Sequence, residues 1–268
     1  MGDIQNQAKQ LTREIPAVPA PWLGTKGEAF FSVALMSASK GLSPGTYGRL
    51  EANSSVADPE ISGEFAGGFG LCMFVRYTQS PVGPYDEVLW APGYFKVPAT
   101  GKKRERITNI YVSSVDSVYN GRRNWNIPKQ LASFKFHPSD TKFPPYKRIE
   151  VSLPDNTDNP FISLDLKPMS LLSRPFLPLS TSYIPLCLDI VIPPLPESEN
   201  WREDGRVGSH DGEWKTTRVG MSGWGGMMKA GGRLGNGSDF PELKRDGMWF
   251  WVRDLDMSFE TVEHEKKD

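Results

Sequence analysis

NIYVSSVDSVYNGRRNWNIPKQLA, residues 109–132, is the stretch on which the predicted fold depends, because it joins two strand-like segments through a short helix. The spacing of its apolar residues predicts that this helix runs from about Val115 to Asn124. Ser113, with Asp116 three residues later, gives a capping signal at the start of the helix. The stretch therefore predicts a strand, a helix and a second strand in succession.

Lys129 follows Pro128 directly, and we expect it to begin the second strand, KQLASFKF, once Asn126 and Pro128 have ended the helix. A lysine amine has an ordinary pKa of about 10.4, so it is protonated at neutral pH and cannot attack a carbonyl. Lowering that pKa to about 7 needs roughly 4 to 5 kcal/mol, which burial or nearby cations such as Arg122 and Arg123 would supply. From this pattern alone, Lys129 is either a solvated surface charge or an amine nucleophile in an apolar pocket.

Short strand-like segments bounded by Gly and Pro make up most of the remaining chain. They are EAFFSVALM from 28, GLCMFVRYT from 70, DEVLWAPGYFKV from 86, RITNIYVSS from 106, RIEVSL from 148, FISLDL from 161, a segment around 183–192, WKTTRVGM from 214 and MWFWVRDLDMSFETV from 248. Many short strands with few helical patterns between them indicate an antiparallel sandwich or barrel. We expect residues 1–268 to form one mainly β domain.

The composition excludes several classes of protein. Thirty-one basic and thirty-two acidic residues give a net charge of −1, which offers no footprint for a nucleic acid. The apolar runs are too short for a membrane span and no secretory signal is evident, so we expect a soluble, cytoplasmic protein. Cys72 and Cys187 should be reduced thiols, and the three histidines His137, His210 and His264 lack the spacing of a metal site.

Glu87 lies in YDEVLWAPGYF, where a strand would place Tyr85, Glu87, Leu89 and Ala91 on one face. That face is apolar apart from a single carboxylate. A buried acid without a partner is costly, so Glu87 either reaches solvent at a strand end or meets a cation or a functional proton.

The segment from Gly220 to Gly237 contains eight glycines and matches no phosphate-binding pattern. Turns or a hairpin tip would explain it. A mobile lid over a pocket is the alternative.

PYDE at 84–87, followed about twenty residues later by the opening stretch, resembles the acetoacetate decarboxylase superfamily. The resemblance is clear over residues 81–136, and its most specific part is Gly121-Arg122 with Pro128-Lys129. It implies a barrel-like, mostly antiparallel sheet with an interior pocket and a few short helices. It also implies that the chain assembles as a homo-oligomer and that no metal or cofactor is needed.

The resemblance implies a role for each matching residue. Lys129 would form a Schiff base with a ketone, after burial or a neighbouring cation has activated its amine. Glu87 would be the second catalytic residue and would position the substrate or move a proton. Tyr85 and Trp125 would contact the substrate. Arg122, in the helix before the lysine, would either line the pocket and contact the substrate or be structural.

The chain also departs from the family pattern. The family carries a second lysine after the Schiff-base lysine, whereas this chain has Gln130, so one source of a lowered pKa is absent. A pocket acid expected about fifteen residues before Glu87 falls on Cys72 in an ungapped match. No arginine matches the family's substrate-facing arginine near the start of the chain, where KGEAFF stands.

Three functions follow as expectations. The first is a carbon–carbon lyase that decarboxylates a β-keto acid through a lysine Schiff base. The second is a Schiff-base aldolase-dehydratase that acts on an α-keto acid. The third is a barrel that binds a small keto acid or ketone without turnover. The Glu87 and Lys129 pair favours an enzyme over this binder, and the sequence does not choose between the two reactions.

Overall fold

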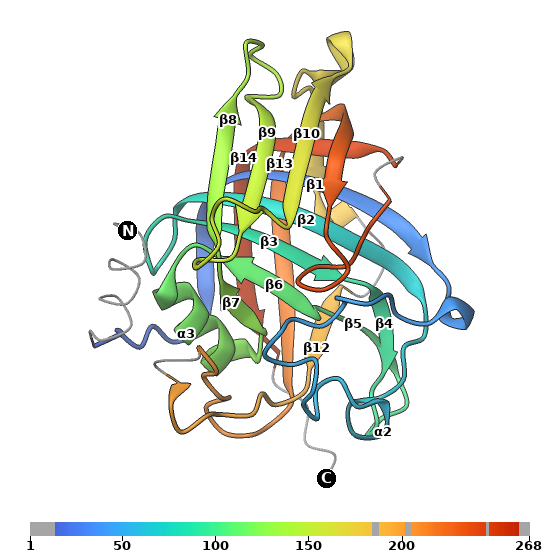
Figure 1. Cartoon of the computed structure of the whole chain (residues 1–268), viewed down its shortest axis with the longest axis vertical. Coiled ribbons are helices and arrows are strands. Elements are labelled where there is room, and N and C mark those ends of the chain that lie inside the picture. The colour runs from blue at the N-terminus through green and yellow to red at the C-terminus, as the bar shows by residue number, and fades with distance from the viewer. Residues whose placement is uncertain (1–13, 184–187, 202–204, 245–246, 263–268) are drawn as a thin grey trace.

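The computed structural model describes residues 14–183, 188–201, 205–244 and 247–262, and these form a mainly β structure with one 14-stranded sheet (Figure 1). The strands are β1 (Trp22–Met36), β2 (Gly68–Gln79), β3 (Tyr85–Ala91), β4 (Gly93–Lys96), β5 (Lys103–Arg106), β6 (Asn109–Val112), β7 (Lys129–Leu131), β8 (Ser133–Pro138), β9 (Tyr146–Ser152), β10 (Ile162–Pro168), β11 (Leu177–Ser180), β12 (Asp189–Ile192), β13 (Lys215–Leu234) and β14 (Trp249–Thr261). The helices are α2 (Pro59–Ser62) and α3 (Val115–Trp125), with 3-10 turns at Ala38–Lys40, Ser170–Ser173 and Thr181–Tyr183. Neither helix is long and apolar enough to cross a membrane.

The predicted strand segments are confirmed, and three of them are divided in two. KQLASFKF divides into β7 and β8 at Ala132. DEVLWAPGYFKV divides into β3 and β4 at Pro92, and RITNIYVSS divides between the end of β5 and all of β6. The segment predicted around residues 183–192 includes 184–187, which lie outside the described residues. The C-terminal part of this segment forms β12. Alternation and turn residues therefore located the strands.

The sheet is mostly antiparallel but does not close. Its strand order is β4-β5-β12-β13-β14-β1-β2-β3-β6-β7, while β10 and β11 pair with the long strand β13 and β9 joins β10 to β8. Two of the pairings, β12 with β5 and β6 with β7, are parallel. Within the part of the chain that the structure describes, β4 and β7 stay unpaired with each other at the two ends of this order. The predicted barrel is therefore not confirmed, and the sheet is open.

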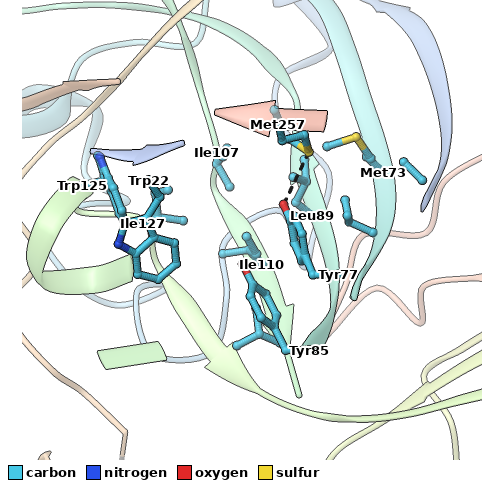
Figure 2. Close-up of a cluster of buried hydrophobic side chains, with 14 of the residues drawn as sticks. Trp22, Met73, Tyr77, Tyr85, Leu89, Ile107, Ile110, Trp125, Ile127 and Met257 are labelled. Atoms are coloured by element: carbon cyan, nitrogen blue, oxygen red, sulfur yellow. Dashed lines mark hydrogen bonds between the residues drawn. The ribbon is translucent and has the colours of Figure 1, made fainter. Parts of the chain in front are cut away.

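Two hydrophobic cores cover the two faces of the central strands. On β3, Tyr85 and Leu89 point into the first core, whereas Val88 and Trp90 point into the second. Figure 2 shows the first core, where aromatic and aliphatic side chains from the sheet meet Trp125 of α3. Because successive residues of a strand alternate between faces, this arrangement fixes the face on which every side chain of β3 lies.

Helix α3 packs beside β7, as Figure 1 shows. Its N-cap is Ser114, whose hydroxyl accepts a hydrogen bond from the Ser117 amide, so the predicted cap at Ser113 is wrong by one residue. The Ser113 hydroxyl instead accepts a hydrogen bond from the Asp86 amide at 2.8 Å. At the other end, Asn126 adopts the left-handed conformation with φ of 57°, which confirms the predicted end of the helix.

The glycine-rich segment is neither a hairpin tip nor a loop over most of its length. Residues 220–234 belong to β13, which pairs with β14 on one side and with β10, β11 and β12 on the other. A side chain at Gly226 would place Cβ 2.5 Å from the Ser173 carbonyl oxygen. The glycines therefore let other backbone segments approach this strand closely, which the prediction of turns missed.

Candidate active site

Lys129 is the first residue of β7, where it pairs with Ile110 of β6 in parallel register. Its side chain is about 5% exposed and runs along helix α3. A Cβ at Gly121 would lie 2.6 Å from Cδ and 2.9 Å from Cε of Lys129, both closer than real Cβ contacts. The glycine therefore opens the face of the helix along which the lysine passes, which gives a physical reason for the Gly121 in the motif.

Three oxygen atoms surround the Lys129 amine. Nζ donates hydrogen bonds to Oε2 of Glu87 at 2.8 Å, to Oγ of Ser117 at 2.9 Å and to the Tyr85 hydroxyl at 3.4 Å. All four residues are buried. Three acceptors match the three N–H bonds of an ammonium group, so the site as it stands holds Lys129 in its charged form.

The pKa of Lys129 is higher than its ordinary value. Burial is the largest single influence and lowers this pKa, but the nearby Glu87 carboxylate and Tyr85 phenol together outweigh it. The prediction that burial or Arg122 and Arg123 would make the amine neutral is therefore wrong. The reason is that β3 brings a carboxylate within hydrogen-bonding distance of the amine.

Strand β3 supplies the predicted acid. Tyr85, Glu87, Leu89 and Ala91 are all buried and share one face, as the alternation predicted. Of the two environments that the sequence left open for Glu87, the structure shows the second, contact with a cation. Sequence alone could not identify that cation as Lys129, which is 42 positions away.

Ser117 and Tyr77 are site residues that the sequence analysis missed. Ser117 precedes Gly121 by one helical turn, so an i, i+4 search on the predicted helix would have found it. Tyr77 on β2 faces Tyr85 across the sheet, with ring centroids 4.6 Å apart. Burial and the nearby Glu87 and Tyr85 raise the pKa of the Tyr77 phenol well above its ordinary value, which keeps it protonated.

Of the two roles predicted for Arg122, its contacts match the structural one. Its guanidinium pairs with Glu51 at 2.7 Å, and both side chains are completely buried. It also donates to the carbonyl oxygens of Val207 at 2.6 Å and Lys129 at 3.3 Å. Arg122 therefore links helix α3 to the main chain at Lys129, while Glu51 compensates its buried charge.

Trp125 lies in the first core, where its ring packs edge-on against Trp22 with centroids 5.0 Å apart (Figure 2). It is buried and helps to exclude water from this side of the sheet. Its predicted contact with a substrate stays a prediction.

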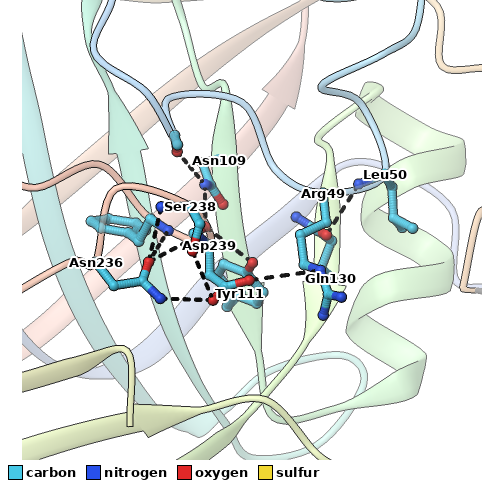
Figure 3. Close-up of polar contacts among 10 residues, drawn as sticks. Arg49, Leu50, Asn109, Tyr111, Gln130, Asn236, Ser238 and Asp239 are labelled. Atoms are coloured by element: carbon cyan, nitrogen blue, oxygen red, sulfur yellow. Dashed lines mark hydrogen bonds and ion pairs between the residues drawn. The ribbon is translucent and has the colours of Figure 1, made fainter.

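Gln130 and Cys72 both lie on the opposite side of the sheet from the Lys129 amine. Figure 3 shows the Gln130 side chain beside the loop at Leu50, whose amide donates to Oε1 at 3.4 Å. Cys72 belongs to the second core, and its neighbour Met73 faces the first. Strand alternation therefore excludes Cys72 as the equivalent of a pocket acid, and it removes Gln130 from direct contact with the amine.

A hollow of about 350 Å³ lies away from these residues, on strands β8, β9 and β10. It is lined by His137, Lys147, Arg148, Asp165, Leu166 and Lys167. An interior pocket at Lys129 stays a prediction. Among the described residues, no group of three or more His, Cys, Asp or Glu side chains lies close enough together to hold a metal ion.

Comparison of the sequence with protein-family models and with curated protein sequences found no match. Comparison of the structure did. Acetoacetate decarboxylase from Legionella pneumophila superposes with a TM-score of 0.57 and 12% identity, covering 96% of this chain and 94% of that one. Another acetoacetate decarboxylase structure gives a TM-score of 0.58 and 11% identity, covering 94% and 95%. A complex of the enduracididine biosynthesis enzyme MppR with pyruvate follows at a TM-score of 0.47 and 15% identity, over 91% and 88%, which is too distant to support an argument.

The two acetoacetate decarboxylase structures cover nearly all of this chain, whereas the sequence resemblance covered only residues 81–136. At this level of identity the similarity concerns the fold. The chain therefore has the acetoacetate decarboxylase-like fold, as its strand–helix–strand motif predicted.

Proposed function

We propose that the protein is a carbon–carbon lyase in which Lys129 forms a Schiff base with the carbonyl group of a keto acid. One observation carries this proposal: a buried lysine amine lies 2.8 Å from a buried carboxylate, between two hydroxyl groups. The shared fold and the Gly121-Arg122 and Pro128-Lys129 motif support it.

The reaction begins with a proton transfer inside the ion pair. Since Lys129 rests as an ammonium, it must give one proton to Glu87 before it attacks a carbonyl carbon. Burial assists this transfer, because two neutral partners avoid the cost of holding two charges away from water. The free amine then adds to the carbonyl, and loss of water leaves an iminium.

The iminium withdraws electrons from the adjacent carbon–carbon bond. With a β-keto acid, carbon dioxide leaves and an enamine remains, whose carbon takes a proton from solvent relayed through Glu87 or Tyr85. Water then hydrolyses the resulting iminium, which releases the ketone and the Lys129 amine. With an α-keto acid, the same iminium supports aldol addition and dehydration. The decarboxylation is the primary proposal, because the fold matches acetoacetate decarboxylase structures.

Borohydride trapping tests this function. The protein is incubated separately with acetoacetate, pyruvate and acetylacetone, reduced with borohydride, and digested for peptide mapping by mass spectrometry. We expect a reduced adduct on Lys129 that disappears in Lys129→Gln and persists in Lys135→Gln, whose lysine lies on β8 and is exposed. No adduct on Lys129 with any of the three compounds would refute the proposal.

Product analysis then separates the two reactions. Release of carbon dioxide from acetoacetate at a rate that depends on Lys129 supports the decarboxylase. Adducts without release of carbon dioxide, together with condensation products from pyruvate, would support the aldolase-dehydratase instead.

A further inference from the structure

The three acceptors around the Lys129 amine are chemically unequal. Glu87 provides a carboxylate, whereas Ser117 and Tyr85 provide hydroxyl groups. Burial raises the pKa of the Tyr85 phenol, so this group stays protonated. Only Glu87 is therefore able to take a proton from Lys129 at neutral pH.

The nitrogen of an ammonium group carries four substituents in a tetrahedral arrangement, here Cε and three N–H bonds. When one proton moves to Glu87, the two remaining N–H bonds still have Ser117 and Tyr85 as acceptors. The lone pair then occupies the direction that pointed to Glu87. The two hydroxyl groups therefore control the direction in which the amine is nucleophilic.

Of these two hydroxyl groups, that of Ser117 holds the amine more tightly. Its distance to Nζ is 2.9 Å, against 3.4 Å for Tyr85, which is long for a hydrogen bond. Ser117 is fully buried on a helix, one turn before the glycine against which the Lys129 side chain packs. Helix α3 therefore fixes both the stem and the tip of the lysine.

We propose that Ser117 is a positioning residue that orients the Lys129 amine so that its lone pair emerges on the side of Glu87, the group that also exchanges protons with the substrate oxygen. This inference rests on the proposed function. It assigns to Ser117 a role that neither the motif nor the fold comparison indicates.

The steps balance around this geometry. Lys129 gives a proton to Glu87, and its lone pair forms a C–N bond while the C=O π bond breaks and the oxygen takes the proton from Glu87. The nitrogen then returns a proton to Glu87, which protonates the hydroxyl group as it leaves. The products are the iminium and one water, and Glu87 is again a carboxylate.

Two measurements on Ser117→Ala, Ser117→Thr and the unaltered protein test the inference. The first is the rate of enaminone formation at Lys129 with acetylacetone, followed by absorbance. The second is the pKa of Lys129, from NMR titration of protein containing ¹³C-labelled lysine. Dividing the rate by the neutral fraction of Lys129 gives an intrinsic rate per free amine.

In Ser117→Ala we expect the pKa of Lys129 to fall, because the ammonium loses one acceptor, while the intrinsic rate falls about tenfold, as for the loss of one hydrogen bond. Ser117→Thr, which keeps the hydroxyl, should recover most of the rate. Ser114→Ala is the matched control, since it removes the helix cap but not a contact with Nζ.

An intrinsic rate and a Lys129 pKa that both stay unchanged in Ser117→Ala would overturn the inference while leaving the Schiff base intact. A pKa that falls without a loss of intrinsic rate would also overturn it, since the contact would then be structural. If the unaltered protein forms no adduct, the proposed function fails, and the positioning role fails with it.

Discussion

Replacing Glu87 with glutamine should convert the Lys129 site from a stable ion pair into a buried, uncompensated cation. The substitution keeps the size and shape of the side chain and removes only its charge. Every other acceptor of the amine stays in place. The effect on stability therefore reports the electrostatic contribution of the carboxylate.

The magnitude follows from the geometry. At 2.8 Å and an effective dielectric constant of about 20, the attraction between the two charges is about 6 kcal/mol. Glutamine recovers part of this as a neutral hydrogen bond, so we expect Glu87→Gln to lower the free energy of unfolding by about 3 to 5 kcal/mol at pH 7. Asp256→Asn, which removes the partner of Lys26 in an exposed pair, is the control and should cost less than about 1 kcal/mol.

The pH dependence has a defined sign. In the unaltered protein the pKa of Lys129 is raised, so the stability it contributes is present at neutral pH and is lost only as pH rises through that raised value. In Glu87→Gln, burial acts without the carboxylate and lowers the pKa below about 10.4. The folded variant then binds fewer protons than the unfolded chain, so its stability increases as the pH rises toward about 10.

Urea unfolding at pH 7 and at pH 9.5 measures both effects. The loss of unfolding free energy in Glu87→Gln, relative to the unaltered protein, should be large at pH 7 and smaller at pH 9.5. Adding Lys129→Met to Glu87→Gln should recover most of the loss at both pH values, because no buried charge remains. A deficit below about 1 kcal/mol that does not change with pH would refute the assignment of a buried ion pair.

Two further substitutions probe the site, and one labelling experiment probes the second core. Gly121→Ala should reduce borohydride-trapped adduct on Lys129 at least about tenfold, because the added Cβ would lie 2.6 Å from Cδ of the lysine. Urea unfolding should show a stability change of less than about 2 kcal/mol, because alanine favours the helix. Undiminished trapping would contradict this packing. Arg122→Lys should destabilise the protein by about 3 kcal/mol in urea unfolding, since lysine cannot bind Glu51 and two carbonyl oxygens in the same geometry; an unchanged midpoint would show that these contacts contribute little. Burial raises the pKa of the Cys72 thiol, so peptide mapping after iodoacetamide treatment should find Cys72 unmodified in the folded protein and modified in urea, and equal labelling would contradict its burial in the second core.

The sequence predicted the strands, the helix before Lys129 and the shared face of Tyr85 and Glu87. These features depend on residues close together in the chain, where alternation, capping and turn chemistry act directly. The motif around Gly121 and Lys129 also predicted the fold that the structural comparison shows. The run of glycines in β13 was misread because local glycine content indicates turns, whereas close approach of other segments required it.

The ionisation state and the surroundings of the amine were decided by tertiary structure. Lys129 and Glu87 are 42 positions apart, and Arg122 and Glu51 are 71 apart, so no local pattern showed either pair. The sequence assigned the nearby arginines to Lys129 because they are its neighbours in the chain. In the folded protein Arg122 instead forms an ion pair with Glu51, and Lys129 forms one with Glu87. A charge removed from water needs a partner of opposite charge within a few ångströms, whatever their separation in the sequence.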